Sequence, residues 1–442
     1  MISLQQAAAW CGGQVLPEYA EVAFFGSHVD SRKIGPGELF IAIPGERDGH
    51  GYIPAAMAAG AAAALGQRQL PGVPMIVVPD SVKAWEQIAA RWRESLKGLR
   101  IIGLTGSVGK TTTKEMCALA CGAARRTQRT LYNYNNERGV AKTLLDFRPE
   151  TELGVVEMGM NHAGEISRLS TMARPNVAVI TGIGKAHIGN LGSQENICRA
   201  KLEILDGLAP DGVAVLNGDD PLLRAAAPAC RTLWFGLGPD NDLRAEEIRD
   251  TGTGVAFTAA GFGRRVRVEL PVPGKHYVMD ALAALLAAHC VDVELETAAK
   301  GLQQFENTGN RLKISEARGC TLIADCYNAG VESMAAAFEV LRDRATAGRR
   351  IAVLGDMLEL GSYAPTAHRL VGAQAAAAAD LVLAFGEESR ALTAAAGEKG
   401  RHFETREALL EALCEAARPG DTILFKASHG MRLEEVLKAF TS

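Results

Sequence analysis

The sequence has little that would place it in a specialised class of protein. Its 47 Lys and Arg almost balance its 51 Asp and Glu, for a net charge of −4, so neither nucleic acid nor a membrane surface is expected as a partner. Its nine cysteines are scattered and form no Cys-x-x-Cys pair, which argues against a disulfide framework or zinc site and favours a reducing cytoplasm. No signal-peptide pattern, membrane-length apolar run, solenoid repeat or disordered tail is apparent.

The length and the pattern of elements predict three α/β domains. A chain of 442 residues is too long for one core, and strand-like and helix-like segments alternate, as in proteins with mainly parallel sheets. We place the domains at residues 1–98, 99–306 and 307–442, because polar residues break the pattern between 305 and 313. Within the second domain, residues 233–272 are predicted to form a small antiparallel addition.

The amino-terminal domain is predicted to contain short mixed elements, including one alanine-rich helix over residues 53–64. Polar turns over residues 27–32 and 44–51 place Arg32 and Arg47 beside glycine and serine backbone donors. Because a guanidinium matches phosphate oxygens as a fork, these turns could hold a diphosphate. Turn chemistry with solvated charges explains the same composition, and the residues alone leave both possibilities open.

The most informative stretch is residues 101–115. An apolar strand leads into a glycine-rich turn and then a helix that begins near Thr111. Gly106 and Gly109, without Cβ atoms, let backbone N–H groups converge on an anion at the positive end of the helix dipole. Lys110 can reach β- and γ-phosphates, and Thr111 can ligate the accompanying Mg²⁺. The alternative is an ordinary strand-turn-helix with a surface lysine, but the ordered set of strand, glycines, Lys-Thr and helix favours a phosphate loop.

Three further candidates lie later in this domain. Glu157 ends a strand predicted over 153–158, on the sheet edge where a carboxylate can hold Mg²⁺ near phosphates. His187 follows a strand predicted over 177–181, although a lone histidine is more often structural. Lys201 lies on a predicted helix, where a lysine is usually solvated.

The last domain is predicted to be Rossmann-like, without a phosphate loop of its own. Its polar segments 325–328, 355–361 and 426–432 each follow an apolar strand, on the edge where α/β sheets bind ligands. Asp325 could bond ribose hydroxyls, and Arg311 could neutralise developing phosphoryl charge. Glycine and aspartate also occur there for backbone reasons alone.

Taken together, these segments resemble the Mur ligase family over essentially the whole chain. The Thr-Gly-Ser-Val-Gly-Lys-Thr-Thr loop is similar to the ATP loop that Mur ligases share with folylpolyglutamate synthases. The segments at 355–361 and 428–432 are the most specific, and are similar to those of the member that adds D-Ala-D-Ala. The matching segments are residues 30–32 (Asp-Ser-Arg), 36–40 (Pro-Gly-Glu-Leu-Phe), 48–50 (Asp-Gly-His), 135–139 (Asn-Asn-Glu-Arg-Gly), 157–166 (Glu-Met-Gly-Met-Asn-His-Ala-Gly-Glu-Ile), 355–361 (Gly-Asp-Met-Leu-Glu-Leu-Gly) and 428–432 (Ser-His-Gly-Met-Arg).

The resemblance implies an ATP-dependent amide ligase of peptidoglycan precursor synthesis. Such an enzyme joins D-Ala-D-Ala to UDP-N-acetylmuramoyl-tripeptide through an acyl phosphate and releases ADP and phosphate. We therefore expect a cytoplasmic monomer with a UDP-substrate domain, a central ATPase domain and a mobile last domain. Two Mg²⁺ ions are implied, one on Thr111 and the other on Glu157 and His187, with a carbamylated Lys201 as a metal-positioning group.

The resemblance also implies the residues of the site. The catalytic residues would be Lys110, Glu157, His187 and Lys201. The nucleotide-binding residues would be Gly106, Ser107, Val108, Gly109, Lys110, Thr111, Thr112, His276, Arg311 and Asp325. The substrate-binding residues would be Ser31, Arg32, Arg47, Asp48, Gly49, His50, Asn135, Asn136, His162, Tyr327, Asn328 and Ser428.

Three segments depart from the family pattern. The family's Gly-x-His-Asn-x-x-Asn, which helps to hold adenine, has Tyr277 and Asp280 in place of its asparagines. The Asp-Ser-Tyr-Asn-Ala-Asn-Pro run reads Asp-Cys-Tyr-Asn-Ala-Gly-Val over residues 325–331. His429 replaces the commoner arginine of Ser-Arg-Gly, the residue expected to meet the acceptor's carboxylate.

Two classes of alternative remain. The family ligase that adds the third amino acid would show an Asp-Asn-Pro-Arg motif, which this chain lacks, and a folylpolyglutamate synthase has no UDP-binding front domain. From a different class, the chain could be a nucleotide-switched binding protein that hydrolyses ATP slowly. Phosphate release without either substrate would favour that switch.

Overall fold

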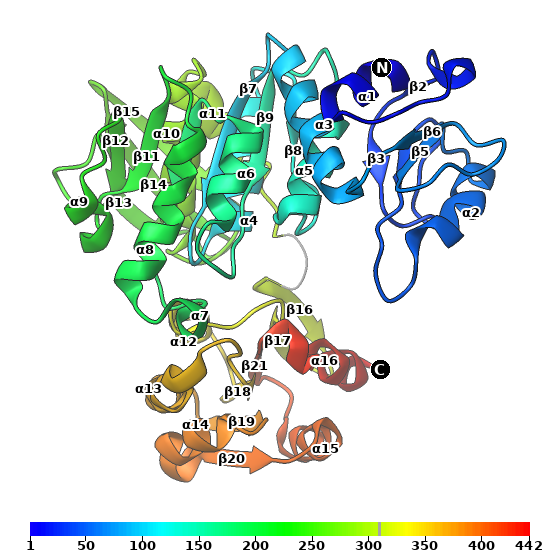
Figure 1. Ribbon diagram of the computed structural model, residues 1–442. Helices are drawn as coiled ribbons and strands as arrows, with labels where there is room; N and C mark the ends of the chain where they lie inside the picture. Colours follow the sequence, from blue (N-terminus) through cyan, green and yellow to red (C-terminus); the bar gives the residue numbers. More distant parts are fainter. Residues whose placement is uncertain (308–310) are drawn as a thin grey trace.

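The computed structural model describes residues 1–307 and 311–442 (Figure 1). Three α/β units follow one another along the chain, each built on a mainly parallel sheet of its own. The three-domain α/β architecture predicted from the sequence is therefore confirmed. Residues 308–310, which belong to the predicted boundary segment 305–313, lie outside the described residues.

The amino-terminal unit packs helices against a four-stranded parallel sheet. Its order is β3-β4-β5-β6, and a short antiparallel pair, β1 with β2, lies beside it. On the last helix of this unit, the buried Trp92 donates its indole N–H to the carbonyl of Phe147, 3.0 Å away in the central unit. The elements are β1 (Ile2–Ser3), α1 (Leu4–Cys11), β2 (Ala23–Phe24), β3 (Ser27–His28), β4 (Leu39–Ile41), α2 (Ile53–Ala58), β5 (Ala63–Gly66), β6 (Met75–Val77) and α3 (Ser81–Ser95).

The single alanine-rich helix expected over residues 53–64 is wrong. Helix α2 ends at Ala58, and Gly60 takes a φ of +102°, which a helix cannot continue through. The rest of the run forms strand β5, which is buried between β4 and β6. Alanine suits both a helix and a fully buried parallel strand, so the alanines themselves could not mark the change.

The central unit is organised around strand β7, which leads into the phosphate loop. Its nine-stranded sheet has the order β15-β14-β13-β12-β11-β10-β7-β9-β8. Strands β7 to β13 each pair in parallel with one another where they are neighbours, and β14 and β15 are antiparallel. The strands are β7 (Arg100–Thr105), β8 (Thr127–Arg129), β9 (Leu153–Glu157), β10 (Val177–Ile180), β11 (Val213–Asn217), β12 (Thr232–Gly236), β13 (Leu243–Asp250), β14 (Val255–Gly261) and β15 (Arg264–Leu270).

The addition expected over residues 233–272 is antiparallel only in its later part. Strand β12 pairs in parallel with β11, so the segment extends the main sheet instead of forming a separate hairpin layer. The helices of this unit are α4 (Lys110–Gly122), α5 (Glu137–Asp146), α6 (Glu165–Ala173), α7 (Ile188–Leu191), α8 (Gln194–Leu202), α9 (Pro221–Ala226), α10 (Tyr277–Cys290) and α11 (Leu295–Leu302).

Helix α10 packs against α4, the helix that follows the phosphate loop, and holds it in place. Its side chains from Ala281 to Ala288 are all fully buried, and it packs against α4, whose Met116 and Ala120 face the same core. A helix that is apolar on every side can only lie inside the protein. The phosphate loop is therefore held between the central strand β7 and a buried helix pair.

The carboxy-terminal unit is a six-stranded α/β sheet of order β16-β17-β21-β18-β19-β20. Only β16 is antiparallel to its neighbour. No helix in the described ranges is both long and apolar enough to cross a membrane. The elements are β16 (Lys313–Ala317), β17 (Cys320–Asp325), α12 (Val331–Asp343), β18 (Arg350–Gly355), α13 (Ala364–Ala378), β19 (Leu381–Phe385), α14 (Ser389–Ala396), β20 (Gly400–Phe403), α15 (Arg406–Ala416), β21 (Thr422–Lys426) and α16 (Leu433–Thr441).

Candidate active site

The loop between β7 and α4 needs glycine at two positions. Gly106 and Gly109 have φ values of +157° and +80°. A Cβ on Gly106 would lie 1.8 Å from the hydroxyl of Thr181, and one on Gly109 would lie 2.3 Å from a carboxyl oxygen of Asp280. Both the backbone conformation and the space exclude a side chain, so the loop keeps its N–H groups turned toward the head of α4.

Lys110 lies at the start of α4 with its ammonium turned back toward the loop. Its Nζ donates to the carbonyl of Gly106 at 2.7 Å. Burial lowers the pKa of Lys110, the Glu157 carboxylate opposes this, and the Arg311 charge lowers it further. The hydroxyl of Ser107 is buried without a hydrogen-bond partner, and Val108 and Thr112 complete the loop and first turn. A half-buried cation beside an unpaired hydroxyl donor is suited to a polyanion.

Glu157, at the end of β9, is almost completely buried, with 1% of its surface exposed. Its Oε1 accepts from the Thr111 hydroxyl at 3.2 Å and from the amide of Asn135 at 2.8 Å. Its Oε2 has no hydrogen-bond partner, although Nζ of Lys114 lies 3.7 Å away. An unpartnered carboxylate oxygen beside a threonine hydroxyl fits a hard cation such as Mg²⁺.

No three His, Cys, Asp or Glu side chains of the described residues are grouped as a ready metal cage. This agrees with the usual way that Mg²⁺ binds, through one or two protein ligands together with phosphates and water. The donor set at Glu157 and Thr111 therefore fits a metal that arrives with a nucleotide.

Lys201 and His187 belong to the same electrostatic neighbourhood. Lys201, on α8, is buried, and burial followed by the Lys110 charge holds its pKa well below its usual range. Across residues 1–307 and 311–442, no carboxylate forms an ion pair with Lys201. His187 precedes α7 with a φ of +63°, and its pKa is lowered by burial and by Lys110. The structure thus brings Lys110, Glu157, His187 and Lys201 together.

The carboxy-terminal unit contributes a stack of side chains. The Arg311 guanidinium lies over the ring of Tyr327, 4.0 Å from its centroid, and the Tyr327 and His429 rings stack with centroids 6.0 Å apart. The Arg311 charge contributes to lowering the pKa of Lys110, so the Arg311 end of the stack lies toward the phosphate loop. His429, which departs from the family pattern, is at the other end of the stack.

The other predicted residues of this unit form hydrogen bonds and an ion pair within the unit. Asp325 Oδ2 pairs with Lys426 Nζ at 2.5 Å, and Lys426 also donates to the carbonyl of Asn328 at 2.9 Å. The hydroxyl of Ser428 accepts from the backbone of Leu358 at 2.9 Å. One carboxylate oxygen of Asp325 is thus already engaged, which leaves the other oxygen to bond a ribose.

Among the predicted nucleotide-binding residues, His276 differs most from an exposed, ligand-binding side chain. Its Nδ1 is buried without a hydrogen-bond partner, and its ring lies 4.0 Å from that of Tyr277. Burial, helped by the Lys426 charge, lowers its pKa to about 4. A neutral imidazole here is suited to stacking or hydrogen bonding and not to pairing with phosphate charge.

The substrate residues predicted in the amino-terminal unit fall into two groups. Asp48 accepts from the backbone and the ring of the buried His50, and Nε2 of His50 accepts from the backbone of Gln67 at 2.9 Å. A Cβ on Gly49 would lie 2.5 Å from the backbone nitrogen of Ile43, so residues 48–50 form a tight structural turn. Ser31, Arg32 and Arg47 are partly or fully exposed, and no described contact joins them to the phosphate loop.

The predicted substrate residues Asn135, Asn136 and His162 also make different kinds of contact. Asn135 holds Glu157, as described above, whereas the side chain of Asn136 caps α5 by accepting from the backbone of Gly139 at 2.9 Å. His162 lies on the surface with its Nδ1 3.3 Å from Glu165 Oε1. Of these three residues, only Asn135 contacts a group at the phosphate loop.

Sequence reasoning assigned no role to three charged residues that lie in the site. Lys114 follows Lys110 by one helical turn, a spacing that places both on one face of α4. Glu359 belongs to a matching segment in which no single residue was singled out. Lys426 ends a buried strand, where lysine is uncommon. This unusual position is the feature of the sequence that could have indicated a functional lysine.

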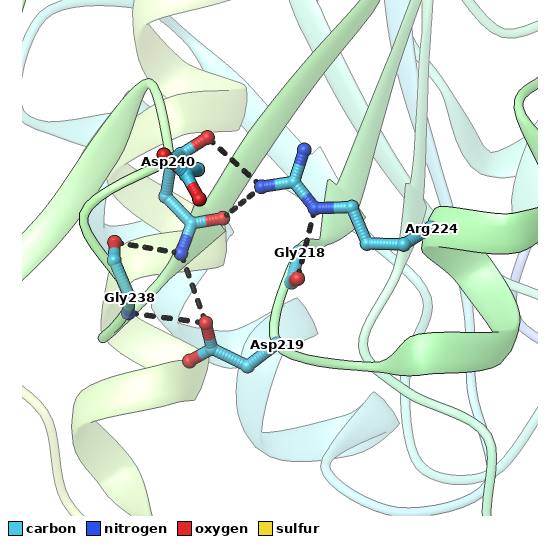
Figure 2. Close-up of a pocket in the computed structure, with 6 residues that line it drawn as sticks. Gly218, Asp219, Arg224, Gly238 and Asp240 are labelled. Atoms are coloured by element: carbon cyan, nitrogen blue, oxygen red, sulfur yellow. Dashed lines mark hydrogen bonds between the residues drawn. The ribbon is translucent and has the colours of Figure 1, made fainter.

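A pocket of about 430 Å³ lies elsewhere, beyond the ends of β11 and β12 (Figure 2). Arg224 donates to the carbonyls of Gly218 and Asp240, and Asp219 accepts from the side chain of Asn241 at 2.9 Å. These groups satisfy one another, and the pocket lies two strands from the phosphate loop. We assign it to the structure of the loops and not to the chemistry.

Comparison with known proteins agrees with this arrangement. Models for three domains of one family match in order: the Mur ligase family catalytic domain over residues 26–93, the Mur ligase middle domain over 104–288, and the Mur ligase glutamate ligase domain over 310–429.

Relatives match over nearly the full length. The UDP-N-acetylmuramoyl-tripeptide–D-alanyl-D-alanine ligase of Bacillus subtilis (strain 168) is 41% identical over 96% of this chain and 94% of its own. A crystal structure of MurF from Acinetobacter baumannii has a TM-score of 0.91 at 32% identity and covers 100% and 98% of the two chains. MurF from Thermotoga maritima in complex with ADP has a TM-score of 0.82 at 28% identity and covers 95% and 97%. With this identity along almost its whole length, the chain belongs to the Mur ligase family.

Proposed function

We propose that this protein is an ATP-dependent ligase that joins D-Ala-D-Ala to UDP-N-acetylmuramoyl-tripeptide. The observation that carries the proposal is the presence of two opposite charges at the phosphate loop, the Lys110 ammonium and the unpartnered Oε2 of Glu157. Relatives at 41% identity that bear this ligase's name support the choice of substrates. The matching MurF in complex with ADP supports the use of ATP.

The nucleotide would lie against residues 106–112, with Arg311, Asp325 and His276 around it. Thr111 would hold one Mg²⁺ ion, and Glu157 with His187 would hold the second, aided by Lys201. When bound, these ions would screen the phosphate charges and polarise the transferred phosphoryl group.

Lys201 is proposed to carry a carbamate. Burial and the Lys110 charge favour its neutral amine, and a neutral amine is the form that reacts with CO₂. The amine nitrogen would form a bond to the carbon of CO₂ and lose a proton, which leaves one negative charge on the carbamate. A carbamate at Lys201 would place a negative charge near Lys110, in a site that is proposed to bind Mg²⁺ ions.

The reaction then follows from where charge develops. The tripeptide carboxylate attacks the γ-phosphorus of ATP, the bond to the bridging oxygen breaks, and ADP leaves with an acyl phosphate formed. Lys110 and Arg311 offset the charge of the transferred group. The amine of D-Ala-D-Ala attacks the acyl carbon, phosphate leaves, and the amine gives up a proton as the amide forms. Ser31, Arg32 and Arg47 would hold the UDP-linked substrate, and the Tyr327, Asn328 and Ser428 region would hold the acceptor.

We further propose that the enzyme acts as a monomer in the cytoplasm. The proposed nucleotide, metal and substrate residues are all assigned within one chain, so the proposal needs no residue from a second copy. The cytoplasm supplies the ATP that the reaction consumes.

Phosphate release tests the proposal. The purified protein should release phosphate only when ATP, UDP-N-acetylmuramoyl-tripeptide and D-Ala-D-Ala are all present, and tripeptides with L-lysine or meso-diaminopimelate at position three should both be tried. Phosphate release with ATP alone at the full rate would contradict a ligase and would favour a nucleotide-switched binding protein.

A further inference from the structure

Besides their hydrophobic contact, the central and carboxy-terminal units meet at a short junction of charged and glycine residues around α7. Figure 1 shows α7 at the edge of the central unit that faces the carboxy-terminal unit. Lys185 donates its backbone N–H to Glu332 at 3.1 Å, and its Nζ lies 2.8 Å from the hydroxyl of Tyr363. A Cβ on Gly189 would lie 2.7 Å from the backbone nitrogen of Gly361. The two backbones therefore touch beside His187.

At this junction, His187 meets a carboxylate of the other unit. Its Nδ1 lies 2.8 Å from Glu359 Oε2, an ion-pair distance, while Nδ1 has no aligned hydrogen-bond partner. The other charges that act on the ring are those of Lys110 and Lys201. Glu359 is thus the single acidic group that the described residues place against this imidazole.

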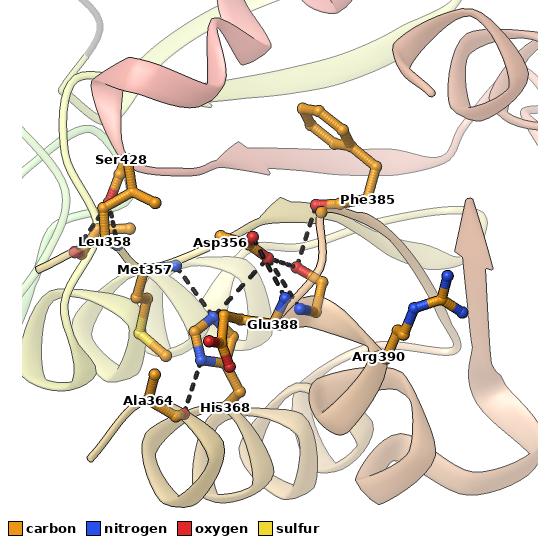
Figure 3. Close-up of polar contacts among 12 residues, drawn as sticks. Asp356, Met357, Leu358, Ala364, His368, Phe385, Glu388, Arg390 and Ser428 are labelled. Atoms are coloured by element: carbon orange, nitrogen blue, oxygen red, sulfur yellow. Dashed lines mark hydrogen bonds and ion pairs between the residues drawn. The ribbon is translucent and has the colours of Figure 1, made fainter. Parts of the chain in front are cut away.

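The three residues that precede Glu359 are anchored by hydrogen bonds, and Figure 3 shows these contacts of Asp356, Met357 and Leu358. Asp356 accepts from the backbone of Ser389 at 2.8 Å, at the start of α14. His368 accepts from the backbone of Met357 at 3.0 Å, and Ser428 accepts from Leu358, as described above. Glu359 itself has a φ of +65°. A loop with three consecutive residues anchored presents the next one in a defined place.

A histidine that binds a metal through one ring nitrogen usually donates its other N–H to a carboxylate or carbonyl. This partner fixes the tautomer and the orientation of the ring, and its loss commonly weakens metal binding by about 10- to 100-fold. Glu359 Oε2, 2.8 Å from Nδ1, is within reach of a proton on that nitrogen. A proton on Nδ1 leaves the lone pair of Nε2 free for a cation.

We propose that Glu359 is a positioning residue for His187, supplied across the domain boundary. The second Mg²⁺ site is then complete only while the carboxy-terminal unit is docked, so phosphoryl transfer is confined to the arrangement that also presents the acceptor. This inference rests on the proposed role of His187 as a ligand of the second Mg²⁺.

The test uses Mn²⁺ in place of Mg²⁺, because electron spin echo envelope modulation detects a nitrogen bound to Mn²⁺. The full-length protein is loaded with Mn²⁺, a non-hydrolysable ATP analogue and the UDP-linked tripeptide. The parent should show ¹⁴N modulation that His187→Ala abolishes. Glu359→Ala should lose at least half of the modulation and weaken Mn²⁺ binding by about 10-fold. Glu359→Gln, which keeps a hydrogen-bond acceptor, should restore most of the modulation.

Glu398→Ala is the matched control, because Glu398 is exposed in the same unit and has no ion pair among the described contacts. It should behave as the parent does. Unchanged modulation and affinity in Glu359→Ala would overturn the inference while leaving His187 as a ligand. Absence of ¹⁴N modulation in the parent would overturn both the inference and the proposed role of His187, so the two failures are distinguishable.

Discussion

At the scale of single residues, the proposed chemistry depends on charged side chains that lie buried or half-buried near the phosphate loop. Glu157 and Lys201 are buried, and Lys110 is half-buried beside them. One oxygen of Glu157 has no hydrogen-bond partner, and Lys201 has no ion pair among the described residues. The sequence could indicate Lys110 from its loop, because the spacing of glycines, lysine and threonine has a mechanical meaning. It could not indicate Glu359 or Lys114, because their importance comes from contacts with residues distant in the chain or from burial.

The first prediction concerns Lys110. Lys110→Ala should lower the rate of ligation by at least about 100-fold, since a donor aimed at developing charge is removed. Phosphate release in the presence of both substrates measures the effect. Lys83→Ala, at an exposed lysine on α3, is the matched control and should leave the rate unchanged. Full turnover in Lys110→Ala would contradict the role of the loop.

The second prediction concerns Asp280, which lies under the phosphate loop. Burial raises its pKa to about 7 against a usual value of 3.8, and a hydrogen bond of 2.8 Å from the Thr113 hydroxyl opposes the shift. The folded state therefore holds a proton that the unfolded state has lost between about pH 4 and pH 7. The free energy of unfolding falls as the pH rises through that window and stays lowered above it.

Asp280→Asn should remove this loss, because the amide is neutral at every pH and its oxygen can still accept from Thr113. The variant should be more stable than the parent at pH 8, by up to about 4 kcal/mol, and close to it near pH 4. Melting temperatures measured from pH 4 to pH 8 test this, with the exposed Asp343→Asn as the control. Parallel curves for the parent and Asp280→Asn would show that the buried carboxyl does not titrate as described.

At the scale of elements, the sequence indicated most strands and helices, because strands buried on both faces read as short apolar runs and amphipathic helices repeat their apolar residues. It failed at residues 53–64, where alanine fits both a helix and a buried strand and only Gly60 marks the change. It also missed that β12 continues the main sheet in parallel. Strand order depends on contacts between distant segments, which local patterns do not contain.

The third prediction compares the two ends of α4. Gly109→Ala should abolish measurable nucleotide binding and destabilise the protein by about 1–3 kcal/mol, because the new Cβ would meet Asp280 in a left-handed backbone conformation. Gly122→Ala, at the other end of the same helix, meets nothing within 4 Å and should keep nucleotide binding. Titration calorimetry with ADP and thermal unfolding measure both. Equal behaviour of the two variants would contradict the steric account.

At the scale of the whole molecule, the proposed reaction uses residues from all three units. A hydrophobic cluster joins α3 of the first unit to α5 and α6 of the second, and a second cluster runs from α10 into α12 of the last unit. The junction at Lys185, His187 and Glu359 lies beside the proposed metal site. An acyl phosphate is destroyed by water, so an arrangement that closes units around it has a direct chemical use.

The measurement that tests the central claim most directly follows the oxygen atoms of the substrate. The tripeptide is supplied with ¹⁸O in the carboxylate that receives D-Ala-D-Ala, and the released phosphate is analysed by mass spectrometry. An acyl phosphate requires that one ¹⁸O pass into each phosphate, with the other retained in the amide. Phosphate without ¹⁸O, or label in a nucleotide product, would contradict the account.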